Sequence, residues 1–123
     1  MKERIVIPTI DNGGLNAKVS EHFGRAPYFT VIDLDEDGNV ASINTVPNTG
    51  EHFGRGGRAK DQILTLNPTA VIVYDMGPRA LMSLQEAKVV VLRANAEIVE
   101  DIISAFKEDK LEELTEGCHH SAH

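Results

Sequence analysis

The fold class follows from the stretch Ala70-Val71-Ile72-Val73-Tyr74. It is nearly continuous in apolar residues and rich in β-branched ones, a pattern typical of a central strand that is covered on both faces. A second buried strand is expected at Val89-Val90-Val91-Leu92. Between the two, Gly77-Pro78 begins a helix that reaches about Ala87, because proline suits the first turn of a helix. Two buried strands joined through a helix predict an α/β domain with a parallel pair of strands.

The residues before this unit predict a meander of three strands and a further helix. Strands are expected over residues 4–7, 28–34 and 40–46, and a helix over residues 58–66, ended by Asn67-Pro68. After the last strand, Asn95 is expected to cap a helix with one apolar face, and Leu111 and Leu114 to form a further turn. The order β-β-β-α-β-α-β-α predicts a three-layer α/β domain with a mixed five-stranded sheet.

An acidic turn between the second and third strands resembles the start of a calcium loop. Asp33, Asp35, Asp37 and Gly38 fit the opening D-x-D-x-D-G, but the position of the closing glutamate holds Asn44. No helical pattern precedes the turn. The stretch is therefore interpreted as a solvated hairpin turn.

Strand direction brings several loops to one edge of the predicted sheet. The first, third, fourth and fifth strands are expected to point the same way, and the second strand the opposite way. The loops after those four strands then share the carboxyl edge, where open α/β sheets bind their ligands. Two of these loops carry the same pentapeptide, Glu-His-Phe-Gly-Arg, at residues 21–25 and 51–55.

The repeated pentapeptide suggests one chemical need that is met in two loops. His22 and His52 offer neutral nitrogen ligands, Gly24 lets a ligand approach the backbone, and Arg25 offers a cation to an anionic group. The flanking residues do not repeat, which disfavours a duplicated domain. The alternative is that both are ordinary loops with solvated histidines.

Two expected helix starts add an anion site at the same edge. They lie at Gly56-Gly57-Arg58 and Gly77-Pro78-Arg79, where free backbone N–H groups and arginines favour an anion. Neither has the spacing of a nucleotide-binding motif, and the alternative is that these glycines only make tight turns. Together with the histidines, the pattern favours a metal-containing anion over a nucleotide.

The last residues hold a second cluster of metal-ligating types. Cys118, His119, His120 and His123 are candidates for capturing a metal, and the alternative is an end with no role. One cysteine cannot build a four-thiolate site, so a bound cluster would be incompletely ligated, which suits transfer. Residues 1–114 are predicted to form a cluster-binding domain and residues 115–123 a flexible tail.

Length and composition limit the class of protein. The chain has 123 residues and is 41% hydrophobic, which suits one globular domain. The net charge of −7 disfavours nucleic-acid binding through bulk electrostatics, and no apolar run is long enough for a membrane span. No signal peptide is visible and a single cysteine excludes an internal disulfide, so a cytoplasmic location is predicted.

Two other functions stay open at this point. Asp11 and Asp75 follow the first and fourth strands, and paired carboxylates at strand ends can hold two metal ions for phosphodiester hydrolysis. The acidic balance and the lack of an obvious third carboxylate disfavour this enzyme. The other alternative is a module that binds only a protein partner, with the histidines incidental.

A set of motifs points to a known family. The set consists of the run at residues 22–29 (HFGRAPYF), Gly56-Gly57, the run at residues 76–80 (MGPRA) and Phe106-Lys107. Across nearly all of residues 1–114, the chain resembles the dinitrogenase iron–molybdenum cofactor biosynthesis family, the NifX-like domain that also occurs at the carboxyl end of NifB-type proteins. One departure is the stretch at residues 85–88 (QEAK), where family members often carry a glycine.

The resemblance implies a ribonuclease-H-like arrangement of strands and a carrier, not an enzyme. Its cargo would be an iron–sulfur or iron–molybdenum–sulfur cluster or a precursor, exchanged with donor and acceptor proteins. Separately, we expect the protein to be a monomer or weak dimer. His22 would be the candidate ligand. The residues implied to flank the cluster are Gly56, Gly57, Gly77, Pro78 and Arg79. The resemblance supports metallocluster binding better than a role in nitrogenase maturation.

Overall fold

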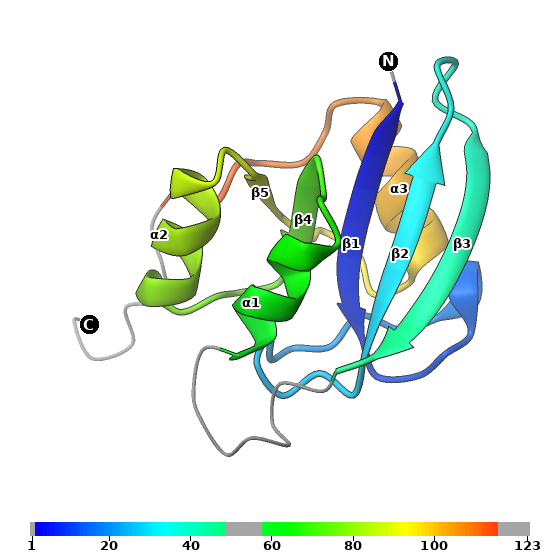
Figure 1. The fold of residues 1–123 in the computed structure, drawn as a ribbon. Coiled ribbons are helices and arrows are strands. Elements are labelled where there is room, and N and C mark those ends of the chain that lie inside the picture. Colours follow the sequence, from blue (N-terminus) through cyan, green and yellow to red (C-terminus); the bar gives the residue numbers. More distant parts are fainter. Residues whose placement is uncertain (1, 49–57, 116–123) are drawn as a thin grey trace.

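The computed structural model describes residues 2–48 and 58–115, with the backbone alone over residues 58–61 (Figure 1). Five strands of this part of the chain form one sheet. They are β1 (Glu3–Thr9), β2 (Tyr28–Leu34), β3 (Val40–Pro47), β4 (Ala70–Val73) and β5 (Val90–Arg93). The helices that accompany them are α1 (Arg58–Thr65), α2 (Pro78–Glu86) and α3 (Val99–Lys107), with a short 3-10 turn η1 (Gly14–Asn16).

The sheet is mixed, with the strand order β3-β2-β1-β4-β5. β2 pairs antiparallel with both β1 and β3, whereas β4 lies parallel to β1 and β5 parallel to β4. β1, β3, β4 and β5 therefore point the same way and β2 the opposite way, as predicted. The apolar stretch that begins at Ala70 is β4, whose four residues are all buried between neighbouring strands on both sides.

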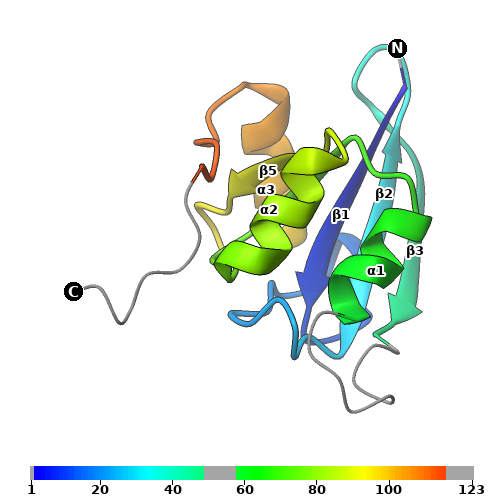
Figure 2. The same cartoon turned by 60° about the vertical axis from the view of Figure 1, so that its left-hand side comes forward.

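Helices cover both faces of the sheet, which confirms the three-layer α/β prediction. One hydrophobic cluster joins one face of the sheet to Ile63 of α1 and to Leu81 and Leu84 of α2. A second cluster joins the other face to Ile102 and Ile103 of α3. Figure 2 shows α1 and α2 in front of the sheet and α3 behind it. The ribonuclease-H-like arrangement stays a prediction.

The start of the last helix differs from the prediction. α3 begins at Val99 with Ile98 as its N-cap, so Asn95 does not cap it. The reason is a contact with the loop after β1, because Val19 N–H donates to the Glu97 carbonyl at 2.8 Å and Val99 N–H to the Ala17 carbonyl at 3.0 Å. These bonds hold the chain extended up to Ile98, and a sequence pattern within the helix cannot reveal them.

The residues after α3 are extended rather than helical, which corrects the predicted turn at Leu111 and Leu114. Glu113 forms an antiparallel bridge with Leu92 of β5. Leu114 N–H donates to the Val91 carbonyl at 2.8 Å, and both Leu111 and Leu114 are buried. This segment covers the outer edge of β5 and so shields an otherwise open strand.

The acidic turn between β2 and β3 is a hairpin turn, as interpreted. Asp35 Oδ1 accepts the N–H groups of Asp37 and Asn39, each at 2.9 Å. Gly38 has φ of +83°, a left-handed conformation that glycine adopts without a steric penalty.

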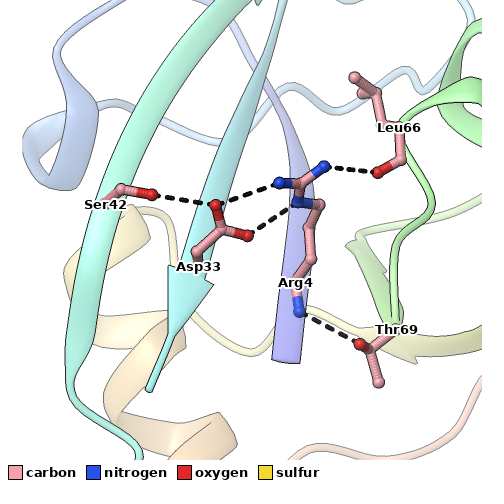
Figure 3. Close-up of polar contacts among 5 residues, drawn as sticks. All are labelled: Arg4, Asp33, Ser42, Leu66 and Thr69. Carbon is pink, nitrogen blue, oxygen red and sulfur yellow. Dashed lines mark hydrogen bonds and ion pairs between the residues drawn. The ribbon is translucent and has the colours of Figure 1, made fainter. Parts of the chain in front are cut away.

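A polar network ties the sheet together at the opposite end from the loops that follow β1 and β4 (Figure 3). Arg4 Nε on β1 donates to Asp33 Oδ1 on β2 at 2.7 Å, and Ser42 Oγ on β3 donates to Asp33 Oδ2 at 2.9 Å. Arg4 Nη1 also donates to the Leu66 carbonyl at 2.9 Å. The bond from Arg4, more than burial, sets the pKa of the Asp33 carboxyl, which is lowered from its ordinary value.

Candidate functional site at the carboxyl edge of the sheet

We call the carboxyl edge of the sheet, made by residues 10–27, 48, 74–77 and 94–98, the loop edge. It lies at the lower end of the sheet in Figure 1. The shared direction of β1, β3, β4 and β5 brings these segments together. This is the edge at which sequence reasoning placed the two pentapeptides.

The first pentapeptide alternates between buried and exposed side chains. Ser20, Phe23 and Ala26 are buried, whereas His22 and Arg25 are exposed. Ser20 Oγ accepts the His22 N–H at 3.2 Å and donates to the His22 carbonyl at 3.0 Å, which fixes the backbone and leaves the imidazole outside. The Phe23 ring packs on Phe29 of β2 at a centroid distance of 6.0 Å. The loop therefore has an anchored inner side and an outer side that presents a histidine and an arginine.

A residue that sequence reasoning missed holds this loop from another strand. Asn48 follows β3 and is only 9% exposed. Its Nδ2 donates to the Ala26 carbonyl at 2.8 Å and to the Gly24 carbonyl at 3.2 Å. No local pattern marks Asn48 in the sequence, because its role depends on a partner more than twenty positions away.

The second described loop of the site leads from β4 into α2. Met76 is buried, while Gly77, Pro78 and Arg79 are exposed. Gly77 is the N-cap of α2 with φ of −64° and ψ of 156°, and Pro78 occupies the first turn as predicted. Met76 and Phe23 belong to the same hydrophobic cluster, so both loops rest on one part of the core. This places Arg79 and the exposed side of the pentapeptide at the same edge.

Neither exposed glycine of these two loops is explained by the fold itself. Gly24 and Gly77 do not have positive φ values, so their backbone conformations would accept an alanine. A Cβ built on either glycine would meet no atom of the described chain within 4 Å. By contrast, a Cβ on Gly13 would meet Asp11 Oδ1 at 3.0 Å. The space above Gly24 and Gly77 is open to a molecule outside this part of the chain.

Charged groups of both signs lie at the part of the loop edge on the α3 side, where Lys18 Nζ is 3.5 Å from Glu97 Oε1. Tyr74 packs against the α3-side cluster and its hydroxyl donates to the Ala96 carbonyl at 3.0 Å. Burial, followed by the nearby carboxylates of Glu97 and Glu21, raises the pKa of the Tyr74 phenol. Arg79 belongs to α2, which covers the opposite face of the sheet. Arg79 therefore offers a cation to an anionic ligand on the α2 side of this edge.

The described residues hold no ready-made metal centre. Among them, no group of three His, Cys, Asp or Glu side chains is arranged to hold a metal ion. Asp11, one half of the proposed carboxylate pair, accepts the Gly13 N–H at 2.9 Å on Oδ1 and the Lys18 N–H at 3.3 Å on Oδ2. Because both of its oxygens organise their own loop, the arrangement disfavours a two-metal phosphodiesterase.

Comparison with known proteins identifies the family. A family model described as dinitrogenase iron-molybdenum cofactor matches residues 3–109. The chain belongs to this family. An uncharacterized protein of Methanocaldococcus jannaschii is 30% identical over 113 residues, which cover 90% of this chain and 91% of that protein. The resemblance found in the sequence motifs is thereby confirmed.

Solved structures share the fold of this family member. An NMR structure of a Thermotoga protein provisionally described as NifB, 30% identical, superposes with a TM-score of 0.78 and covers 96% of this chain and 98% of that one. The apo form of the orange protein from Desulfovibrio gigas, 23% identical, has a TM-score of 0.75 and covers 93% and 94% of the two chains. At that identity the likeness shows the fold alone.

The predicted site residues of this family member fall into two groups. The structure places two sets of them at the same edge of the sheet: His22, Gly24 and Arg25 after β1, and Gly77, Pro78 and Arg79 after β4. The others lie outside the described residues, and their roles stay predictions. They are His52, Gly56, Gly57, Cys118, His119 and His120.

Two further predictions about the chain keep that status. The boundary between a domain over residues 1–114 and a tail over residues 115–123 stays a prediction, because residues 116–123 are not described. No helix in the described ranges is long and apolar enough to cross a membrane. The cytoplasmic location also stays a prediction.

Proposed function

We propose that this member of the dinitrogenase iron-molybdenum cofactor family carries an anionic iron–sulfur or iron–molybdenum–sulfur cluster, or a precursor of one, on the loop edge. The cluster is cargo that the protein receives from a donor protein and passes to an acceptor. The family assignment supports the kind of cargo. The proposal assigns the chain a binding role and no catalytic step.

The open glycines are the observation that carries the proposal. Gly24 and Gly77 are compatible with a side chain, yet each leaves the backbone bare at an exposed point of the site. A large anion with sulfur at its surface gains from such positions, because it can approach backbone N–H groups and the start of a helix. Nothing in the described part of the chain needs a glycine at either position, whereas a ligand would gain from both.

Charged and ligating side chains surround the two glycines. The exposed imidazole of His22 can supply a nitrogen ligand to iron or molybdenum in its neutral form. Arg25 and Arg79 offer guanidinium groups that offset the charge of the cluster. Among the described residues one histidine leaves most metal positions of a cluster unligated by the chain, which suits a carrier that must release its cargo.

Anaerobic loading tests the proposal. The protein is mixed with a synthetic iron–molybdenum–sulfur cluster, and bound iron and visible absorption are measured after gel filtration. We expect binding by the wild type and a large loss in His22→Ala. Arg79→Gln should weaken binding, whereas Lys88→Gln, which removes the same charge from the other end of α2, should not.

Each arm can contradict a different part of the proposal. Failure of the wild type to bind would reject the carrier function and favour a module that binds only a protein partner. Equal binding by the wild type and His22→Ala would remove His22 as a ligand. Equal weakening by Arg79→Gln and Lys88→Gln would show a response to net charge and not to the site.

A further inference from the structure

The turn that carries Gly24 and Arg25 is held from β3 by one buried side chain. Asn48 Nδ2 donates to the carbonyls of both Gly24 and Ala26, and Asn48 N–H donates to the Pro27 carbonyl at 3.0 Å. Within the turn itself, Ala26 N–H lies 3.5 Å from the Phe23 carbonyl, a long bond that holds it weakly. The direction of the peptide groups in this turn therefore depends on Asn48.

The Gly24 carbonyl also determines where the next amide points. A trans peptide group is planar, so its N–H points away from its C=O. The Gly24 carbonyl faces the buried Asn48 side chain, and the Arg25 N–H is consequently directed to the opposite side. Both residues are exposed there, and within the described chain Arg25 N–H has no hydrogen-bond acceptor.

We propose that Asn48 is a positioning residue that turns the Gly24–Arg25 peptide so that the Arg25 N–H donates to a sulfur-containing anion bound at the loop edge. The inference rests on the proposed function, because it names how the same site meets its cargo. The donated N–H acts at the point where the bare Gly24 permits close approach. Fixed backbone donors of this kind are a recurring way of holding anions.

Asn48 differs from an ordinary stabilising residue because its amide fixes the direction of peptide groups at the site. Loss of its amide leaves the Gly24 and Ala26 carbonyls without this donor, so the turn is free to rotate its peptide groups. Supporting residues behind a metal ligand typically change affinity by about tenfold to a hundredfold when they are removed. A comparable loss of cargo affinity is expected here, although Asn48 does not touch the cargo.

An NMR titration of the full chain tests the proposal. The probe is tetrathiomolybdate, a diamagnetic molybdenum–sulfur dianion, added under anaerobic conditions to ¹⁵N,¹³C-labelled protein. We expect the Arg25 amide proton to move downfield on binding in the wild type. In Asn48→Ala, the carbonyl ¹³C shifts of Gly24 and Ala26 should change before any probe is added, and the affinity should fall at least about tenfold.

Two further variants separate positioning from stability. Ser42→Ala removes a side-chain bond at the opposite end of the sheet, the one to Asp33 Oδ2, and should bind the probe like the wild type. Asn48→Leu has a similarly branched side chain, carries no charge and cannot donate, and should lose affinity as Asn48→Ala does. If Asn48→Ala does not fold, Asn48→Leu decides.

The outcomes that overturn the proposal differ from those that overturn the carrier function. Equal affinity in the wild type and both Asn48 variants, or equal losses in Ser42→Ala and Asn48→Ala, would reject the role of Asn48. If the wild type binds neither this probe nor the synthetic cluster, the carrier function fails. In that case unchanged Gly24 and Ala26 carbonyl shifts in the variants would reject the positioning of the turn as well.

Discussion

Replacement of Gly24 by alanine should raise the stability of the fold and lower the affinity for a ligand. Gly24 has no positive φ, and the added methyl group would meet no described atom within 4 Å. In such a position alanine stabilises a protein by about 0.4–1 kcal/mol, because it restricts the unfolded chain. For a chain of this size, the change corresponds to an increase in Tm of up to about 4 °C.

The same methyl group would stand between the loop and its cargo. If it moves a unit charge from about 4 Å to about 5.5 Å from a guanidinium, the attraction falls by about 1 kcal/mol at an effective dielectric constant of about 20. Loss of a hydrogen bond from the backbone adds about 1 kcal/mol. Together these terms predict a loss of affinity of about thirtyfold.

Two measurements on the same variant check both halves of this prediction. Thermal unfolding gives the Tm, and anaerobic titration with the synthetic cluster gives the affinity. Gly77→Ala is the companion variant and should also lose affinity, although alanine at an N-cap costs some helix stability. A Gly24→Ala variant that is stable and binds the cluster as tightly as the wild type would refute the reasoning from the open glycines.

Three further predictions concern stability. Lys88 has a left-handed conformation with φ of 66° at the end of α2, so Lys88→Gly should raise the free energy of unfolding by about 1 kcal/mol in a urea titration, and no gain would contradict this. The pKa of Asp33 is lowered in the folded state, so its pair with Arg4 contributes stability above about pH 4 that is lost as the pH falls through the folded pKa. The difference in free energy of unfolding between the wild type and Asp33→Asn should therefore shrink below about pH 4. A difference that stays constant with pH would count against the pair. Phe23→Ala should reduce the free energy of unfolding by about 3 kcal/mol, since the ring is 7% exposed and packs on Phe29, and a loss below about 1 kcal/mol would show that the ring anchors little.

The sheet could be predicted from the sequence because its information is local. The apolar run at residues 70–74 predicts a buried strand, and the right-handed crossover rule then sets the direction of its neighbours. Strand direction alone brings the loop with His22 and the loop with Arg79 to one edge. The hairpin turn could also be predicted locally, from the turn-forming residues Asp35, Asp37 and Gly38.

The features that could not be predicted depend on contacts between distant segments. The pairing of residues 97–99 with residues 17–19 delays the start of α3, and the bridge from Glu113 to Leu92 straightens the chain after it. Asn48 shows the same limit within the site, since its burial and its bonds to the turn after β1 require the folded sheet. The openness above Gly24 likewise follows from its surroundings and not from the residue type.

The left-handed conformation of Lys88 could not be predicted either, because no local pattern in the sequence marks it. The departure from glycine was visible as a difference from the family, but its backbone cost depends on the left-handed φ that ends α2. Lys88 N–H donates to the Gln85 carbonyl at 3.0 Å in that conformation. The lysine side chain makes this left-handed conformation sterically unfavourable, and the hydrogen bond that ends the helix offsets part of that cost.

Native mass spectrometry of the anaerobically loaded protein tests the central claim most directly. It gives the number of iron, molybdenum and sulfur atoms that stay with each chain. We expect one cluster per chain in the wild type and in a chain that ends at Glu116, and none in His22→Ala. A cluster that stays on His22→Ala but is lost from the shortened chain would contradict it, because the cargo would then bind to the last residues and not to the loop edge.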